Sequence, residues 1–151
     1  MKLKYLVPFV FLLPLAVTPA SALTLNGMGL VAAAVGPCGN PCVVSGNSGG
    51  RIVSFKGAGD AIRNGAGQPL VISGYCASAC MVMAARARPR VCITSTATFA
   101  YHKTNWNRPI PLSADLHRWV MQHGGYPEFR GTPGVMPNEV ARRFFRTCNQ
   151  A

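Results

Sequence analysis

A serine flanked by small residues is the first candidate for chemistry in this sequence. An apolar segment at 69–73 runs into Gly74-Tyr75-Cys76-Ala77-Ser78-Ala79-Cys80, and a second apolar segment follows at 81–85. The pattern predicts a strand that turns sharply into a buried helix, with Ser78 at the helix N-terminus. The free N–H groups at a helix N-terminus favour negative charge. Ser78 can therefore be a nucleophile, and one of these N–H groups can be one of the donors of an oxyanion hole. The alternative is a tight connection in which Ser78 only caps the helix.

Acyl transfer by a serine also needs a general base, oxyanion donors and a group that orients the base. His102 ends the strand expected after the Ser78 helix, so a strand–helix–strand return would bring it beside the turn. Gly49 and Gly50 follow an earlier short strand, and glycines let a backbone N–H approach a ligand closely. Sites in open α/β sheets gather at the carboxyl ends of strands. We therefore expect the Ser78 turn, His102 and the Gly49-Gly50 loop at one edge of the sheet. The alternatives are that His102 has only a structural role and that the glycines form an ordinary turn.

Apolar runs, helical spacing and glycine or proline stops predict the elements that would position these residues. The expected strands are 42–44, 70–73 and 90–93, the last continuing through 97–101, and the expected helices are 51–64, 79–86, 114–123 and 138–146. The segment 23–35 is expected to be a first strand or a loosely held N-terminal arm. Strands alternating with helices in this order are typical of an α/β domain with a partly parallel sheet.

Three motifs occur in order: Ser45-Gly46-Asn47-Ser48-Gly49-Gly50, then Gly74-Tyr75-Cys76-Ala77-Ser78-Ala79, then Phe99-Ala100-Tyr101-His102-Lys103. They resemble the S-P-G-G oxyanion loop, the G-x-A-A-S-M nucleophile turn and the V-M-I-H-Q base segment of the Clp protease proteolytic subunit. The match covers about residues 42–103, with nearly the family's spacings. The C-x-S-A-C form further resembles small secreted relatives of that peptidase within the crotonase-like superfamily.

The resemblance implies a fold, an activity and a set of site residues. Residues 23–151 would form a single Clp-peptidase-like α/β domain, a spiral of β-β-α units with a mostly parallel sheet. Ser78 would be the nucleophile, His102 the base, and the backbone N–H groups of Gly50 and Ala79 the oxyanion hole. The implied reaction is peptide hydrolysis through an acyl-enzyme that water deacylates, and no cofactor is expected.

The sequence departs from the family's pattern at the third member of the triad. The family's orienting acid falls just before the late helix, but residues 129–134 contain no carboxylate, and Ser48 replaces the loop proline. Glu128 is the acid nearest to the expected place. Asp115 is the other candidate, although early in a predicted helix it can instead interact with the helix dipole. Without an orienter the histidine tautomer is unspecified, which can cost several orders of magnitude in rate.

The chain starts with a segment typical of a secretory signal peptide. Lysines precede an apolar run at 5–17, and the small residues Ala20 and Ala22 precede Leu23. The alternative is a retained membrane anchor, but a spanning helix needs roughly 20 apolar residues, and this run is shorter and contains prolines. We expect residues 1–22 to be removed, leaving a periplasmic or secreted protein with no stable membrane span.

The six cysteines all lie in the part that would remain: Cys38, Cys42, Cys76, Cys80, Cys92 and Cys148. An even number behind a signal peptide predicts disulfides formed in an oxidising compartment. Cys76 and Cys80 could clamp the turn through disulfides to Cys92 or Cys148, but six cysteines allow 15 pairings and the sequence does not choose among them. Zinc binding is the rival interpretation. No pair of histidines at ligand spacing accompanies the cysteines, so no metal site is expected.

Charge limits the classes of partner. Removing 22 residues, which include two lysines, leaves 129 residues and lowers the net charge from +11 to +9, and this length suits one domain with one core. The basic residues are scattered and accompany no nucleic-acid motif. We therefore expect weak attraction to anionic surfaces and no nucleic-acid partner. The peptide or protein substrate is what the family resemblance implies. Two further hypotheses stay open: a non-catalytic, disulfide-stabilised binding or structural module of the same fold, and a cationic envelope-binding protein.

Overall fold

The described chain begins with a helix that the sequence pattern does not predict. The computed structural model describes residues 27–148, so the expected signal peptide at 1–22 lies outside the described residues. Gly27–Val35 forms helix α1, and the prediction of a strand or loose arm at 23–35 is therefore wrong for this part. Its consecutive alanines favour a helix, and α1 packs against the helix at Ile52–Arg63, α2, with Val31 buried.

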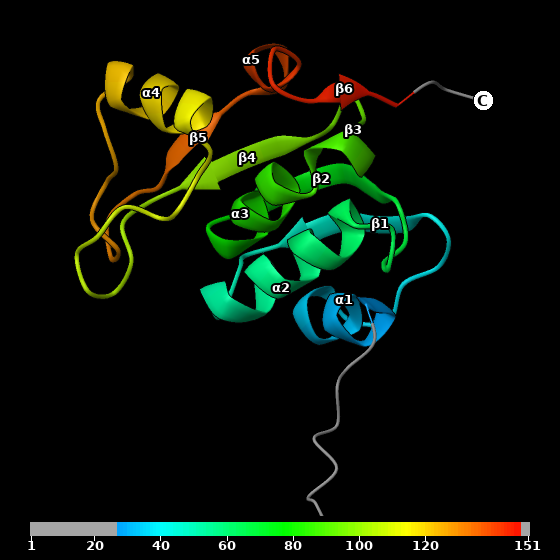
Figure 1. The fold of residues 1–151 in the computed structure, drawn as a ribbon. Coiled ribbons are helices and arrows are strands. Elements are labelled where there is room, and N and C mark those ends of the chain that lie inside the picture. Colours follow the sequence, from blue (N-terminus) through cyan, green and yellow to red (C-terminus); the bar gives the residue numbers. More distant parts are fainter. Residues whose placement is uncertain (1–26, 149–151) are drawn as a thin grey trace, which may run out of the picture.

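A mixed, curled β-sheet lies at the centre of this α/β fold (Figure 1). Its strands are β1 (Cys42–Asn47), β2 (Leu70–Ala77), β3 (Val91–Ile93), β4 (Thr98–Tyr101), β5 (Gly134–Met136) and β6 (Arg146–Thr147). Strand β2 pairs in parallel with β1, β3 and β4, and β6 pairs in parallel with β3. Strand β5, which the sequence pattern does not predict, is antiparallel to β4. The α/β class is confirmed, and β5 makes the sheet mixed.

Strand β2 holds the sheet together and ends at Ser78. Its first half, 70–72, pairs with β3, its second half, 75–77, pairs with β4, and β1 pairs along its other side. The sequence pattern predicts only 70–73 as strand, because Gly74 reads as the start of a turn. Pairing on both sides keeps the backbone extended as far as Ala77. As a result the carboxyl ends of β1, β2 and β4 lie next to one another.

Two helices pack closely against each other beside the sheet. Helix α2 (Ile52–Arg63) and helix α3 (Ala79–Arg86) lie side by side (Figure 1), and both confirm the predicted helices at 51–64 and 79–86. A Cβ at Gly59 would lie 2.8 Å from the Met83 carbonyl oxygen. This glycine, which weakens an isolated helix by about 1 kcal/mol relative to alanine, therefore allows the two helices to approach. Arg86 and Asp60 join them through an ion pair at 2.8 Å.

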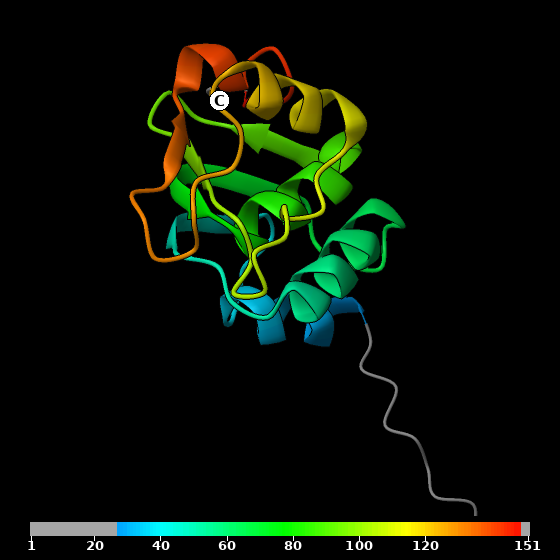
Figure 2. The same ribbon diagram turned by 90° about the vertical axis from the view of Figure 1, so that its left-hand side faces the viewer.

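The remaining helices lie at the opposite end of the molecule from α1. Helix α4 (Ala114–Gln122) and helix α5 (Asn138–Ala141) are at the top of both views and α1 is at the bottom (Figures 1 and 2). A short 3-10 helix, η1 (Arg88–Arg90), connects α3 to β3. The prediction of a helix at 114–123 is confirmed. The prediction at 138–146 is wrong beyond Ala141, where the chain turns and becomes strand β6.

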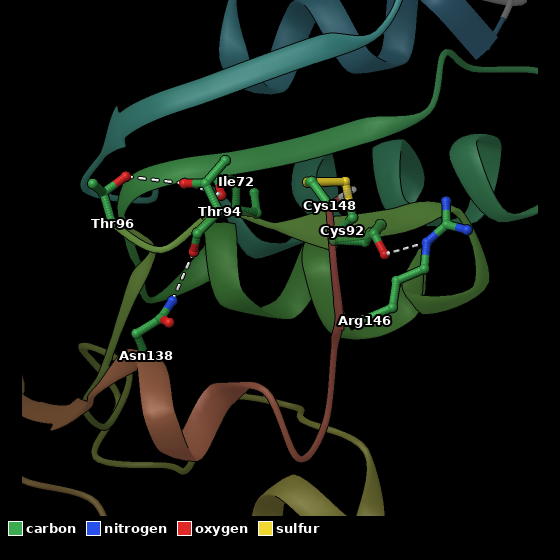
Figure 3. The surroundings of a disulfide bond; sticks show 8 residues. Ile72, Cys92, Thr94, Thr96, Asn138, Arg146 and Cys148 are labelled. Atoms are coloured by element: carbon green, nitrogen blue, oxygen red, sulfur yellow. Dashed lines mark hydrogen bonds between the residues drawn. A yellow bond between two sulfur atoms is a disulfide. The ribbon is translucent and has the colours of Figure 1, made fainter. Parts of the chain in front are cut away.

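Contacts with the sheet explain why α5 is short. Cys148 forms a disulfide with Cys92, and its N–H donates to the Ile93 carbonyl at 2.9 Å. The side chain of Asn138 donates to the Thr94 carbonyl at 2.7 Å. Figure 3 shows the disulfide and the Asn138 amide directed toward Thr94. These bonds hold the C-terminal segment alongside β3. An extended backbone can pair with β3 there, whereas a helix could not.

The described residues contain three disulfides and no free cysteine, which confirms the prediction of disulfide bonds. The pairs are Cys38–Cys42, Cys76–Cys80 and Cys92–Cys148. The possible disulfides from Cys76 or Cys80 to Cys92 or Cys148 do not form, because Cys76 and Cys80 pair with each other. The sharp turn from β2 into α3 brings Cys76 and Cys80 to a Cα–Cα distance of 5.3 Å, within disulfide reach. Disulfides are typical of oxidising compartments, and between residues 27 and 148 no helix is long and apolar enough to cross a membrane.

Asp115 joins α4 to η1 through an ion pair. Its Oδ2 lies 2.6 Å from Arg88 Nη1, and Arg88 Nη2 also donates to Ser113 Oγ at 2.7 Å. The hydrogen bond from Arg88 lowers the pKa of Asp115 well below its usual value of 3.8. The pair therefore contributes stability only while Asp115 is ionised.

We expect Asp115→Asn to lower the free energy of unfolding at pH 7 by about 0.5–1 kcal/mol, a small effect because the side chain is 46% exposed and solvent screens the pair. Because the folded-state pKa is lowered, this stability is present above the unfolded-state pKa of about 3.9 and is lost as the pH falls toward the folded value. Urea unfolding at pH 7 and pH 3 should show the difference shrinking in acid. The exposed Glu139→Gln is the control, and a pH-independent difference for Asp115→Asn would contradict this account.

Candidate active site

Ser78 lies in a strained turn between the end of β2 and the start of α3. Its φ is 54° and its ψ is −116°, a backbone conformation that glycine adopts easily and serine does not. The Ser78 N–H donates to the Ala100 carbonyl at 2.8 Å, and the Ser78 carbonyl accepts from the Val82 N–H at 3.2 Å. Holding a non-glycine residue in such a conformation costs about 1–3 kcal/mol. A strained strand-to-helix turn is a known way to expose a nucleophilic serine.

The hydroxyl of Ser78 does not cap the helix. A capping serine accepts a hydrogen bond from an N–H in the first turn, and Ser78 forms no such bond. The capping alternative is therefore wrong. Although Ser78 is only 8% exposed, it lines a cavity, and within residues 27–148 its hydroxyl has no hydrogen-bond partner. The side chain is thus available to a ligand in that cavity.

The disulfide Cys76–Cys80 brackets the strained turn. One cysteine is near the end of β2 and the other is in the first turn of α3, and both are fully buried. The covalent link restrains the two elements on either side of Ser78, which limits the ways in which the backbone could relax.

Glycine and alanine at position 78 should differ in stability. We expect the free energy of unfolding of Ser78→Gly to be about 1 kcal/mol higher than that of Ser78→Ala. Glycine removes the cost of the positive φ, whereas alanine keeps it. Urea denaturation of both variants measures the difference. The control pair is Ser95→Gly and Ser95→Ala, at an exposed serine without a positive φ, where the order should reverse. Equal stabilities at position 78 would mean that the turn carries no strain.

The glycine loop after β1 lies against the Ser78 turn. Gly49 has a φ of 90°, and a Cβ there would lie 2.7 Å from the Ala77 carbonyl oxygen and 2.9 Å from the Ala79 nitrogen. The Gly49 N–H donates to Asn47 Oδ1 at 2.8 Å, which fixes the loop. Only a glycine lets this backbone come so close to the start of α3. Asn47 belongs to the glycine motif, but its hydrogen bond to Gly49 was not predicted, although an asparagine before glycines is a recognisable turn signal.

The two expected oxyanion donors come from these neighbouring segments. Ala79 is the first residue of α3, so its N–H has no acceptor within the helix. Gly50 follows Gly49 and lines the same cavity as Ser78. Gly50 therefore lines the cavity together with Ser78, and Ala79 follows Ser78 directly at the start of α3.

His102 follows directly after β4. Because Ala77 pairs with Ala100 in parallel strands, the end of β4 lies beside the Ser78 turn, and His102 and Ser78 line the same cavity. The Nδ1 atom of His102 is hydrogen-bonded to the backbone carbonyl of Lys103. Since a carbonyl only accepts, Nδ1 is the nitrogen that carries the proton in the neutral ring, and Nε2 is then the acceptor. The ring packs edge-on against Phe129, with 5.3 Å between centroids.

Neither candidate acid forms a hydrogen bond with His102 in the part of the chain that the structure describes. Glu128 Oε1 lies 2.6 Å from Lys103 Nζ, and Asp115 is held by Arg88. The Lys103 N–H also donates to the Pro127 carbonyl at 2.8 Å. Glu128 therefore lies close to His102 in the fold, but its ion pair is with Lys103. The carbonyl of Lys103 is the group that orients the ring. No sequence signal marks such a backbone carbonyl.

The cavity that joins Ser78 and His102 has a volume of about 650 Å³, a size typical of ligand sites. Its apolar walls are Ile52, Val53, Trp106 and Phe129, and its other lining residues are Ser48, Gly49, Gly50, Arg51, Thr104 and Asn105. Val53 and Trp106 are each 78% exposed and Phe129 is 50% exposed. Large apolar side chains gathered in the open around one cavity mark a surface that a ligand or partner covers. Residue types and spacing do not reveal these walls, because they come from loops and a helix start far apart in the chain.

Compared with protein-family models, with curated proteins and with solved structures, the chain gives no match.

Proposed function

We propose that this protein is a secreted or periplasmic serine hydrolase, similar to the Clp peptidase, that cleaves peptides through an acyl-enzyme on Ser78. The observation that carries the proposal is the strained turn that leaves the Ser78 hydroxyl uncapped in a cavity shared with a tautomer-fixed histidine. Parallel pairing of β2 with β1, β3 and β4 is also what a spiral of β-β-α units requires.

The residues take the following roles in this reaction. His102 Nε2 accepts the Ser78 proton as Oγ attacks the peptide carbonyl carbon, forming the new C–O bond. The N–H groups of Gly50 and Ala79 donate to the oxyanion of the tetrahedral intermediate. His102 then gives the proton to the leaving amine as the C–N bond breaks. Water, activated by His102 in the same way, releases the acid and restores Ser78.

The Lys103 carbonyl replaces the carboxylate of a conventional triad in this proposal. It supplies one function of that acid, because its hydrogen bond holds Nδ1 protonated and the ring in place. It lacks the other, because a neutral dipole stabilises the imidazolium less than a negative charge does. We therefore expect a slow hydrolase rather than an inactive one.

A peptide-binding module without turnover is the second candidate. The observation that favours it is that, among residues 27–148, no carboxylate orients His102 and no hydrogen bond links it to Ser78. The same cavity and apolar walls would then hold a peptide without cleaving it.

Turnover separates the two candidates. The full chain, with residues 1–22 included, is expressed into an oxidising compartment, purified and assayed against a library of fluorogenic peptides with apolar residues. Hydrolysis that Ser78→Ala reduces to a small residual rate and Ser95→Ala leaves intact would support the hydrolase, since Ser95 is exposed and does not line the cavity. Saturable peptide binding without any turnover would instead establish the binding module.

A further inference from the structure

Arg51 stands one residue after a proposed oxyanion donor. It follows Gly50 directly, and consecutive Cα atoms are about 3.8 Å apart. It precedes helix α2, and its carbonyl accepts from the Ser54 and Phe55 N–H groups at 3.0 Å and 3.3 Å. These bonds fix the Arg51 backbone at the wall of the cavity that contains Ser78.

The guanidinium of Arg51 is not neutralised by the protein. The ion pairs within residues 27–148 engage Arg86, Arg88 and Lys103, and the Arg51 side chain, which is exposed, forms neither an ion pair nor a hydrogen bond there. No carboxylate lines the cavity. An exposed arginine at the wall of a cavity, with no hydrogen-bond partner in the described residues, is suited to bind a carboxylate through two parallel hydrogen bonds.

A second feature makes the same wall electropositive. Ile52 and Val53, which open α2, also line the cavity, and the positive end of the helix dipole lies there. The first turn contains no acidic residue and no side chain caps the helix. The lining of the cavity therefore combines apolar walls with one arginine at the start of α2.

We propose that Arg51 makes this site selective for peptides that carry a carboxylate close to the bond facing Ser78. The carboxylate is either the C-terminus of the peptide or an acidic side chain, since both present the same group to a guanidinium. The proposal refines the proposed hydrolase by naming its substrate class. It concerns binding, however, and can be tested without turnover.

Binding is measured on the Ser78→Ala variant of the full chain, which cannot form an acyl-enzyme. The reporter is the fluorescence of Trp106, which is 78% exposed and lines the cavity, whereas Trp119 is 8% exposed. The probes are short apolar peptides in two matched pairs: a free against an amidated C-terminus, and an internal aspartate against asparagine. We expect at least one carboxylate form to bind about tenfold more tightly than its amide partner, and the pair that shows it identifies the source of the group.

Arg51→Gln should abolish this preference, and Arg63→Gln should retain it, because Arg63 is exposed at the far end of α2 and does not line the cavity. Raising the ionic strength to about 1 M should also weaken the preference. Equal affinities within both pairs, a preference that survives Arg51→Gln, or no binding of any probe would overturn the proposal. Selective binding by a protein that hydrolyses nothing would refute the proposed hydrolase and leave the assignment of Arg51 standing.

Discussion

His102→Gln is expected to lower kcat/KM for any cleaved peptide by about 10³-fold or more, since general acid–base catalysis contributes about 10²–10⁴-fold and glutamine cannot take a proton from Ser78. The double variant Ser78→Ala/His102→Gln should be scarcely slower than Ser78→Ala alone, because residues that act as a unit are not additive. Steady-state kinetics of the three variants measures both effects. Independent, multiplicative losses would contradict a Ser78–His102 pair.

The control for this prediction is His123→Gln. His123 lies at the end of α4, bonded through Nδ1 to the Trp119 carbonyl at 2.8 Å, and does not line the cavity. Its replacement should leave kcat/KM unchanged. The tautomer can be observed directly as well: nitrogen NMR of the free enzyme should show His102 with the proton on Nδ1, since that atom faces the Lys103 carbonyl. A proton on Nε2 would remove the free base that the mechanism needs.

Gly49→Ala is expected to lower kcat by about 10²–10³-fold, the loss typical of a disturbed oxyanion hole, with a smaller change in KM. The added Cβ would lie 2.7 Å from the Ala77 carbonyl oxygen and 2.9 Å from the Ala79 nitrogen. Because both atoms belong to the backbone and the φ of 90° is unfavourable for alanine, the loop must move. Its movement displaces the Gly50 N–H relative to that of Ala79.

Gly46→Ala is the matched control for this substitution. It lies three residues earlier, has no positive φ, and a Cβ there would meet nothing within 4 Å. Both variants are assayed after near-ultraviolet circular dichroism has established the folded fraction, so that a loss of stability is not mistaken for a loss of catalysis. If folded Gly49→Ala keeps its kcat, the loop does not form an oxyanion hole.

The local pattern of apolar residues predicts the central helices and strands of the fold correctly. The helices at 51–64 and 79–86 and the strands at 42–44 and 90–93 were visible because their apolar spacing matches their own burial. The turn at Ser78 was also visible, since small residues separate two apolar runs. In these segments the local preference and the final environment agree, so the local sequence is enough to predict them.

Elements that depend on distant partners were not predictable in this way. Gly74 reads as a turn, yet β2 continues because β1 and β4 pair with it on both sides. The segment after Ala141 has a helical pattern but becomes β6 through its pairing with β3. The pairing of Cys76 with Cys80 follows from the angle of the Ser78 turn, which residue spacing does not contain.

The residues of the site also differ in whether the local sequence reveals them. Ser78, His102 and the glycine loop belong to motifs and could be found from residue types and spacing. The Lys103 carbonyl that orients the histidine is a backbone atom, and the side chains of Trp106 and Phe129 reach the cavity from separate loops. The missing carboxylate is visible in the sequence as a departure from the family's pattern. The Lys103 carbonyl that takes its place cannot be read from residue types.

The most direct test of the central claim is covalent labelling of the oxidised full chain with a fluorophosphonate. An activated serine attacks phosphorus and displaces fluoride, so the account predicts one adduct per chain in the intact mass, mapped by peptide sequencing to Ser78. The adduct should be absent from Ser78→Ala, strongly reduced in His102→Gln, and unchanged in Ser95→Ala. Failure to label the folded, disulfide-bonded protein, or labelling that persists in Ser78→Ala, would contradict the assignment of Ser78 as a catalytic nucleophile.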